Sequence, residues 1–117
     1  MNKSLTIEQK LGITGDYQYK ALHKGFFLQS NWHNNKLISL RPLMKKSVDV
    51  LDLGTGSGNL ELTYGGNVNS IVGVDYNPEA LEFLKGELKA RKIKNVRLVK
   101  ADLRTLRFSD LGNNKFD

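Results

Sequence analysis

The sequence predicts an α/β fold: a parallel sheet with strands in the order 3-2-1, preceded by a helical flank. Over residues 48–100, short runs rich in Val, Ile and Leu alternate with segments of helical period. Turns rich in glycine or containing Asn-Pro separate these segments. Strands that alternate with helices form parallel sheets through right-handed crossovers, which leaves the first strand at an edge.

The helical flank comes first in the chain. Residues 1–16 have no sustained period, so we expect them to be loosely ordered. Residues 17–32 have apolar side chains at helical spacing, and residues 37–44 fit a second, short helix. Pro42 should break or kink that second helix, because the residue before a proline is disfavoured in the α region.

The first strand runs directly into a glycine-rich turn. Residues 48–53 are rich in Val and Leu, and Gly54, Gly56 and Gly58 follow at every second position. Glycines at this density allow positive φ and let a ligand approach the main chain closely. Such a turn lies at the carboxyl ends of the strands, where open α/β sheets bind ligands. The glycine turn, residues 54–58, is therefore the predicted binding site.

The segment after the glycine turn predicts a short helix, a second strand and a longer helix. Two glycines at residues 65–66 should stop the short helix, and residues 70–75 then form a strand of Ile and Val. Asn77 can cap the next helix and Pro78 suits its first position. That helix should run to about Lys92 and pack its leucines on the sheet.

The pattern closes with a third strand and the beginning of a fourth. Residues 96–99 read as the third strand, and the polar "GNN" at residues 112–114 precedes "KFD", where a fourth strand would begin. The expected organisation is a helical flank over residues 1–47 and the first half of a ligand-binding domain over residues 48–117.

A carboxylate before the glycine turn indicates the kind of ligand. Asp52 lies two residues before Gly54, where it would repel a pyrophosphate by an energy on the order of a kcal/mol and attract an ammonium or sulfonium group. The dinucleotide fingerprint G-x-G-x-x-G/A fails as well, because its third position falls at Asn59 or Glu61. Both observations disfavour a nicotinamide dehydrogenase.

These segments resemble the class I S-adenosylmethionine-dependent methyltransferases. "VLDLGTGSG" is similar to their first motif, an acidic residue, any residue and then G-x-G-x-G. "IVGVDYNPEAL" is similar to their second strand, "VRLVKADLRTLRF" to their third strand and acidic loop, and "KFD" to the start of their fourth strand. The resemblance implies a Rossmann-like fold, S-adenosylmethionine as cofactor, and a domain truncated at the start of strand four.

Around the glycine turn, the resemblance implies contacts with the methionine portion of the cofactor. Asp52 would face the ammonium group, Thr55 and Ser57 would offer hydroxyls, and the main chain of the three glycines would lie against the ligand. The alternative is an ordinary strand-to-helix turn, which needs only one such glycine.

At the ends of the second and third strands, the resemblance implies contacts with the nucleoside. Asp75 would accept hydrogen bonds from both ribose hydroxyls, and Tyr76 would cover one face of the adenine. Asp102 would accept from the adenine amino group, and the Leu103 main chain would meet the ring. The alternatives are a helix-capping role for Asp75, an exposed loop aromatic at Tyr76 and a simple loop acid at Asp102.

Composition limits the function classes. Among the 117 residues there is no cysteine, which excludes disulfides, thiolate metal sites and cysteine nucleophiles. His23 and His33 have neither metal-ligand nor triad spacing, so no catalytic residue and no metal site is predicted. The sequence has no apolar run that could span a membrane and no signal peptide, so we expect a cytoplasmic protein without a membrane span.

Two hypotheses from different classes follow. The first is the cofactor-binding part of an enzyme that transfers a methyl group to an unidentified acceptor. The loop after the third strand favours a small molecule or lipid, while the net charge of +6, concentrated in residues 1–50, leaves RNA open. The second is a non-catalytic module that binds a nucleoside cofactor or nucleic acid. We expect this chain alone to be inactive, and the edge of the first strand to recruit another copy or a complementing chain.

Overall fold

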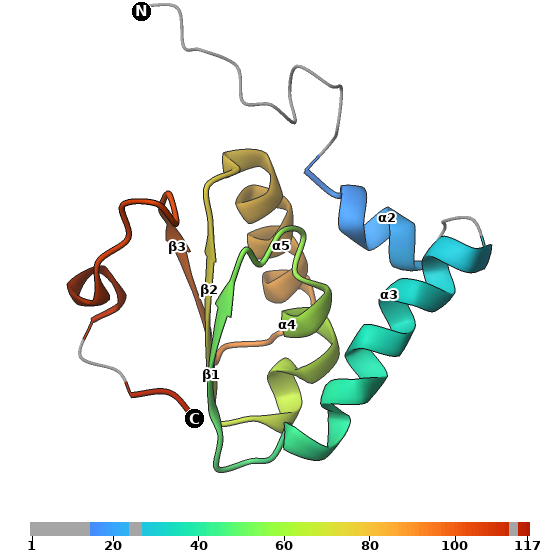
Figure 1. The fold of residues 1–117 in the computed structure, drawn as a ribbon, viewed down its shortest axis with the longest axis horizontal. Helices are drawn as coiled ribbons and strands as arrows, with labels where there is room; N and C mark the ends of the chain where they lie inside the picture. Colours follow the sequence, from blue (N-terminus) through green and yellow to red (C-terminus); the bar gives the residue numbers. More distant parts are fainter. Residues whose placement is uncertain (1–14, 24–26, 113–114) are drawn as a thin grey trace, which may run out of the picture.

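The computed structural model describes residues 15–23, 27–112 and 115–117, and it confirms the predicted fold class. Three parallel strands form an open sheet with helices packed against it (Figure 1). The strands are β1 (Asp49–Leu53), β2 (Ser70–Asp75) and β3 (Val96–Lys100). Their spatial order is β1-β2-β3, which is the predicted order with β1 at the edge.

The register brings the carboxyl ends of the strands together. Leu53 at the end of β1 is opposite Val74, and Asp75 at the end of β2 is opposite Lys100 at the end of β3. The segments that leave these ends therefore meet above one edge of the sheet.

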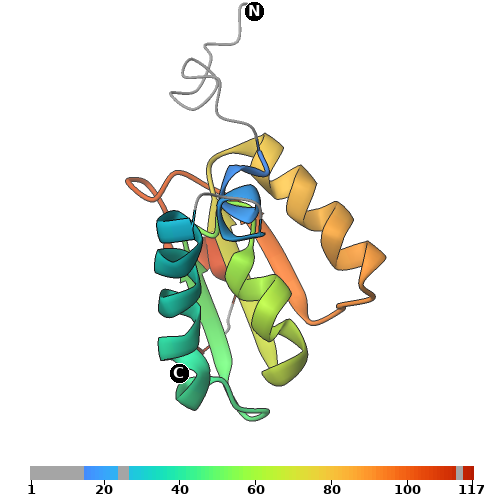
Figure 2. The ribbon, with the colours of Figure 1, turned by 90° about the vertical axis from the view of Figure 1, so that its right-hand side faces the viewer.

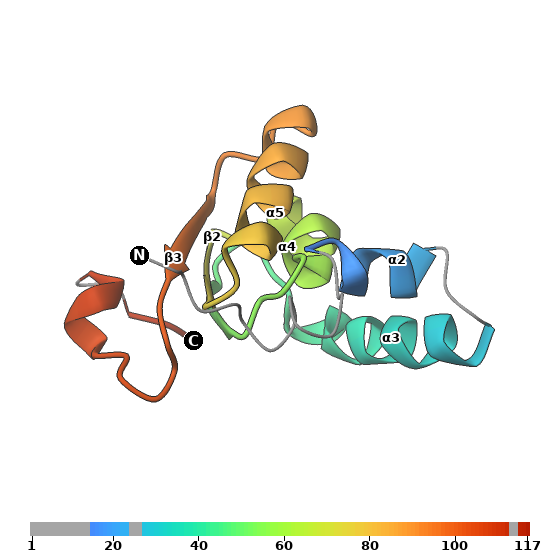
Figure 3. The same cartoon turned by 90° about the horizontal axis from the view of Figure 1, so that it is seen from above.

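The helices form a layer on one face of the sheet. They are α2 (Tyr17–His23), α3 (Phe27–Leu40), α4 (Asn59–Tyr64) and α5 (Pro78–Ala90). Figure 2 looks onto this layer, and Figure 3 shows that the segment after β3 lies on the opposite side of the sheet. Within the described ranges, no helix is both long enough and apolar enough to cross a membrane.

The helix boundaries predicted for the flank were wrong. One helix over residues 17–32 was expected, whereas α2 ends at His23 and α3 then continues to Leu40. The polar run in the middle of α3 hid its continuity, because this helix is largely exposed: the Trp32 side chain is 58% accessible. Pro42 lies in a 3-10 turn after the end of α3. Residues 1–14, where a loose start was expected, lie outside the described residues.

The predictions for α4 and α5 are confirmed apart from one boundary. Two glycines follow α4, and Asn77 caps α5 by accepting hydrogen bonds from the main-chain N–H groups of Glu79 and Ala80. The helix ends at Ala90, before the expected Lys92, because Lys92 adopts a left-handed conformation with φ of 57°.

Each face of the sheet has its own packing. Leu84 and Leu88 of α5 are buried on the helical side. On the other side, Val72 and Val74 pack with Leu111 from a 3-10 helix at Phe108–Leu111, and further apolar residues surround them. The chain then returns to the free edge of the sheet: the Asp117 N–H donates to the Asp49 carbonyl at 2.9 Å. This is where a fourth strand was expected to begin.

Candidate functional site

The glycine turn is anchored to the neighbouring strand. The main-chain N–H groups of Gly54 and Thr55 both donate to the Val74 carbonyl, at 2.8 and 3.0 Å. Gly54, Gly56 and Gly58 have φ values of 82°, 56° and 82°, so all three adopt the positive φ that the spacing predicted. The turn is thus a fixed structure that continues the sheet into α4.

The glycines of the turn have different structural roles. A Cβ added at Gly54 would meet no atom within 4 Å, so the space beside this residue is open to a ligand. A Cβ at Gly58 would lie 2.2 Å from Leu84 Cδ1 in the core. Gly58 is therefore required by the packing of the turn on α5, whereas Gly54 borders the open side.

Asp75 organises the turn from the end of β2. Its Oδ2 accepts a hydrogen bond from the Gly56 N–H at 2.8 Å, and its Oδ1 accepts from the Asn77 N–H at 2.8 Å. The carboxylate is half-buried and held in one orientation by these bonds. Each oxygen retains one lone pair, so the side chain can still accept two more hydrogen bonds.

The first of two pockets lies over the ends of β2 and β3, and we call it the strand-end pocket. Its volume is about 270 Å³. The structure brings together here all four residues that were assigned to the nucleoside, together with one glycine of the turn and one arginine. The lining residues are Gly54, Asp75, Tyr76, Asp102, Leu103 and Arg104.

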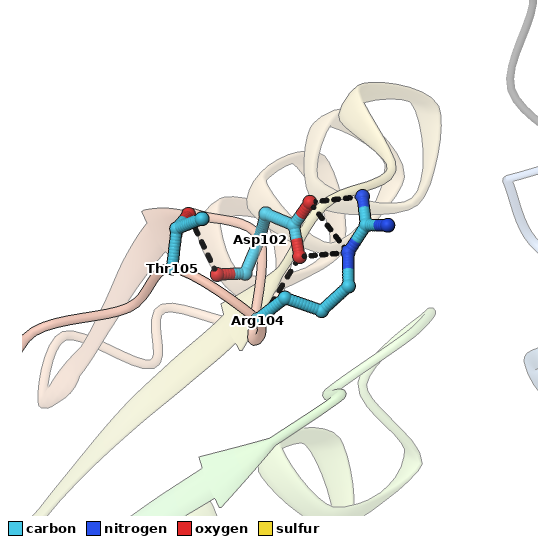
Figure 4. Close-up of polar contacts among 3 residues, drawn as sticks. All are labelled: Asp102, Arg104 and Thr105. Atoms are coloured by element: carbon cyan, nitrogen blue, oxygen red, sulfur yellow. Dashed lines mark hydrogen bonds and ion pairs between the residues drawn. The ribbon is translucent and has the colours of Figure 1, made fainter.

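Arg104 is a member of this pocket that the sequence analysis missed. Its guanidinium donates to both carboxylate oxygens of Asp102, with the shortest contact at 2.6 Å, and its main-chain N–H donates to Asp102 Oδ1 at 2.9 Å (Figure 4). Thr105 Oγ1 donates to the Asp102 carbonyl. The hydrogen bonds from Arg104 lower the pKa of Asp102 to about 2. Asp102 is therefore an anion at neutral pH, and Arg104 fixes its orientation.

The second pocket lies between α3 and the glycine turn, and we call it the helix-side pocket. Its volume is about 400 Å³. Asp52 and Gly54 form one wall, and α3 forms another through His33 and Lys36, which the sequence analysis had not assigned to a site. Burial, and secondly the charge of Lys36, lower the pKa of His33. The remaining lining residues are Leu37, Ser39, Leu40, Thr55, Asn59 and Leu60.

The two hydroxyls of the glycine turn are engaged within the protein. Ser57 is buried, and its Oγ accepts a hydrogen bond from the Tyr19 N–H at 2.7 Å, which attaches α2 to the turn. Thr55 is also buried and donates through Oγ1 to Glu61 Oε1. These contacts differ from the expected role of both hydroxyls as ligand contacts. They stabilise the turn itself.

Glu61 is the second residue of the site that the sequence analysis missed. It lies in the first turn of α4 and its side chain is 0% exposed. Burial, and secondly the negative charge of Asp52, raise the pKa of Glu61 to about 8. Gly73 in β2 gives it space, because a Cβ there would lie 3.0 Å from Glu61 Oε1. A glycine inside an Ile/Val strand is the sequence signal that could have revealed this close approach.

The parallel sheet, the glycine turn and the acids at the strand ends are the features of an α/β domain of the class I methyltransferase type. A family model described as a methyltransferase domain matches residues 44–117, which is more than half of the chain. The protein therefore belongs to this family of class I S-adenosylmethionine-dependent methyltransferases.

Comparisons with individual proteins agree with this family. The chain is 36% identical over 61 residues to the release factor glutamine methyltransferase of Aliivibrio fischeri, covering 50% of this chain and 22% of the relative. Its fold is similar to the YcgJ protein of Bacillus subtilis, with 26% identity and a TM-score of 0.59, covering 65% of this chain and 33% of that one.

A third similar protein is coclaurine N-methyltransferase, solved with N-methylheliamine and SAH. The identity is 25% and the TM-score 0.54, over 64% of this chain and 24% of that protein. The chain thus spans between about a fifth and a third of the length of these three proteins.

Proposed function

We propose that this chain supplies the S-adenosylmethionine-binding part of a methyltransferase. The observation that carries the proposal is that the strand-end pocket and the helix-side pocket meet at Gly54, beside which the space is open. One pocket has Asp75 and Asp102, and the other has Asp52. A ligand that extends across Gly54 would have a hydrogen-bonding nucleoside at one end and a cationic group at the other.

In the strand-end pocket, the proposed contacts are to the nucleoside. The two lone pairs that the main chain leaves on Asp75 would accept from the ribose hydroxyls, and the exposed ring of Tyr76 would cover the adenine. The Leu103 main chain would meet the adenine, and the Asp102 carboxylate, which Arg104 holds in place, would accept a hydrogen bond from the adenine amino group.

In the helix-side pocket, the proposed contact is between Asp52 and the ammonium group of the ligand. No lysine or arginine of the described ranges forms an ion pair with Asp52, so a bound cation would supply its counter-charge. When bound, the cofactor supplies a methyl group on a sulfonium centre, which is already an activated leaving group. The protein then contributes chiefly alignment, and we propose no catalytic residue.

For the acceptor, we propose a small molecule or lipid first. The sequence of the loop after β3, "ADLRTLRF", favours this class of acceptor, and the loop contributes residues to the strand-end pocket. The relative that modifies a glutamine of a release factor favours a protein acceptor, and the basic first half of the chain favours RNA. Labelled methyl transfer by the full-length gene product to acceptors of these three classes separates them.

We further propose that the outer edge of β1 pairs with another strand. On that side, the described residues give two hydrogen bonds, both between Asp49 and Asp117, while the other side of β1 is fully paired with β2. An apolar edge of this kind attracts a complementing strand, from the same protein or from a second copy. Size-exclusion chromatography of the purified chain over a range of concentrations tests whether β1 pairs with a second copy.

The test of the proposed function is calorimetry with S-adenosylmethionine and S-adenosylhomocysteine, which share the ammonium group. Asp52→Asn should weaken both ligands by about 1.5 to 3 kcal/mol, roughly 10- to 150-fold in Kd. Asp110→Asn, on the opposite side of the sheet, is the matched control and should change neither Kd. A loss confined to S-adenosylmethionine would mean that Asp52 faces the sulfonium instead. Binding without any methyl transfer by the full-length protein would favour the non-catalytic module.

A further inference from the structure

Glu61 is the part of the site that the proposed function leaves unused. Its carboxyl is fully buried, and Thr55 Oγ1 donates to Oε1. The other oxygen, Oε2, has no hydrogen-bond partner among the residues that the structure describes. An ionised carboxylate in that position would carry a large desolvation cost with one hydrogen bond to offset it. A protonated carboxyl carries a much smaller cost.

Among the described residues, no lysine, arginine or histidine forms an ion pair with Glu61. The β1 strand contributes the like charge of Asp52, and β2 contributes the bare main chain of Gly73. Asp52 disfavours a negative charge on Glu61, and the main chain of Gly73 offers no compensating charge.

Lys36, His33 and Asp75 are other titratable groups of the described residues near the site. Lys36 of α3 lines the pocket, but its ammonium lies 3.8 Å from the centre of the Trp32 ring. His33 also lines the pocket and is partly buried. Asp75 uses both oxygens to hold the main chain. Among the described residues no cation forms an ion pair with Asp52, so we expect the positive charge there to come from a ligand.

We propose that Glu61 is a positioning residue that holds a proton in the free protein and releases it when a cationic ligand binds beside Asp52. The inference rests on the proposed function, because it needs a ligand with an ammonium group in the helix-side pocket. The O–H bond of Glu61 breaks, the proton passes to solvent, and no electron moves. The bound cation then lies against two carboxylates, Asp52 directly and Glu61 behind it, so the pair of charges is stabilised only when the ligand is present.

The raised pKa of Glu61, about 8, determines whether ligand affinity rises or falls with pH, and over which pH range. Below pH 8 the free protein carries the proton, and ligand binding must displace it. Affinity should therefore rise with pH up to about 8 and then level off. For one proton released, the dissociation constant changes by about tenfold per pH unit over this range.

The first test is calorimetry of the full chain with S-adenosylhomocysteine between pH 6 and 9, in buffers of different ionisation enthalpy. At pH 7 we expect about one proton released per ligand bound, with none released above pH 9. Glu61→Gln keeps the size and a donor but cannot ionise, so it should abolish both the proton release and the pH dependence above pH 7. Glu82→Gln, an exposed glutamate of α5, is the matched control and should leave both unchanged.

The second test needs no ligand and no variant. Carbon-13 NMR of the free protein should show the Glu61 carboxyl titrating near pH 8, and titration below pH 5 would overturn the inference. Binding of S-adenosylhomocysteine without proton release at pH 7 would also overturn it, while leaving the proposed function intact. Absence of binding at every pH would overturn the proposed function, and the coupling with it.

Discussion

Gly54 and Gly58 allow the packing role and the ligand role of the glycine turn to be separated by experiment. Both residues have φ of 82°, so alanine at either position must adopt a backbone conformation that side chains with a Cβ rarely take. They differ in what the new methyl group meets. At Gly58 it would lie 2.2 Å from Leu84 Cδ1 and 2.8 Å from Leu84 Cγ, whereas at Gly54 it would meet nothing within 4 Å.

The expected magnitudes follow from this difference. An alanine held at positive φ costs about 1 to 2 kcal/mol, and we use this figure for both positions. Gly58→Ala adds the cost of overpacking, about 1 to 3 kcal/mol, because the Leu84 side chain is 0% exposed and has little space to move. The free energy of unfolding should thus fall by about 2 to 5 kcal/mol for Gly58→Ala and by about 1 to 2 kcal/mol for Gly54→Ala.

Urea denaturation followed by circular dichroism measures both losses, and calorimetry with S-adenosylhomocysteine measures binding. We expect Gly54→Ala to be the variant that loses affinity, because Gly54 lines both pockets and its new methyl group would occupy open space beside them. The double variant Gly58→Ala with Leu84→Ala should be less destabilised than the sum of its parts, since the contact is then removed. Equal losses of stability at the two glycines would refute the assignment of Gly58 to packing on α5.

Two further predictions concern single contacts. Asn77→Ala removes the cap of α5 and should lower the free energy of unfolding by about 0.5 to 2 kcal/mol in urea denaturation, while Asn77→Asp should retain most of it. Arg104→Gln should return the pKa of Asp102 from about 2 toward its ordinary value near 3.8, as read by carbon-13 NMR. Because that pKa is depressed in the folded protein, the pair stabilises the fold above pH 4, and this contribution disappears as the pH falls toward 2. If Arg104→Gln and the wild type lose the same free energy of unfolding between pH 4 and 2, the prediction is wrong.

The sequence could predict the sheet and much of the strand-end pocket for one physical reason. Val, Ile and Leu runs between glycine and Asn-Pro turns identify parallel strands, and parallel strands present their carboxyl ends at one edge. Residues that follow those ends, such as Asp75 and Asp102, must then lie near one another. The sequence contains this information locally, so no knowledge of the packing was needed.

The features that were missed depend on contacts between distant segments. The exposed face of α3 has no apolar period, so its length and its place beside the glycine turn could not be read from the sequence pattern. Ser57 was expected to face a ligand, but the main chain of Tyr19 uses its hydroxyl. Glu61 has the pattern of an ordinary acid in the first turn of a helix. Its carboxyl group can be buried because Gly73 has no side chain and leaves space for it.

The three carboxylates at the strand ends are treated differently by the protein, and the difference indicates where a ligand's charge belongs. Asp75 is neutralised in part by two main-chain N–H groups, and Asp102 by the guanidinium of Arg104. Asp52 has instead a second carboxyl, Glu61, beside it. Two neighbouring carboxyl groups of this kind destabilise the folded protein unless one of them stays protonated. The arrangement becomes favourable when a cation binds, which supports the proposal that the positively charged group of the ligand lies in the helix-side pocket.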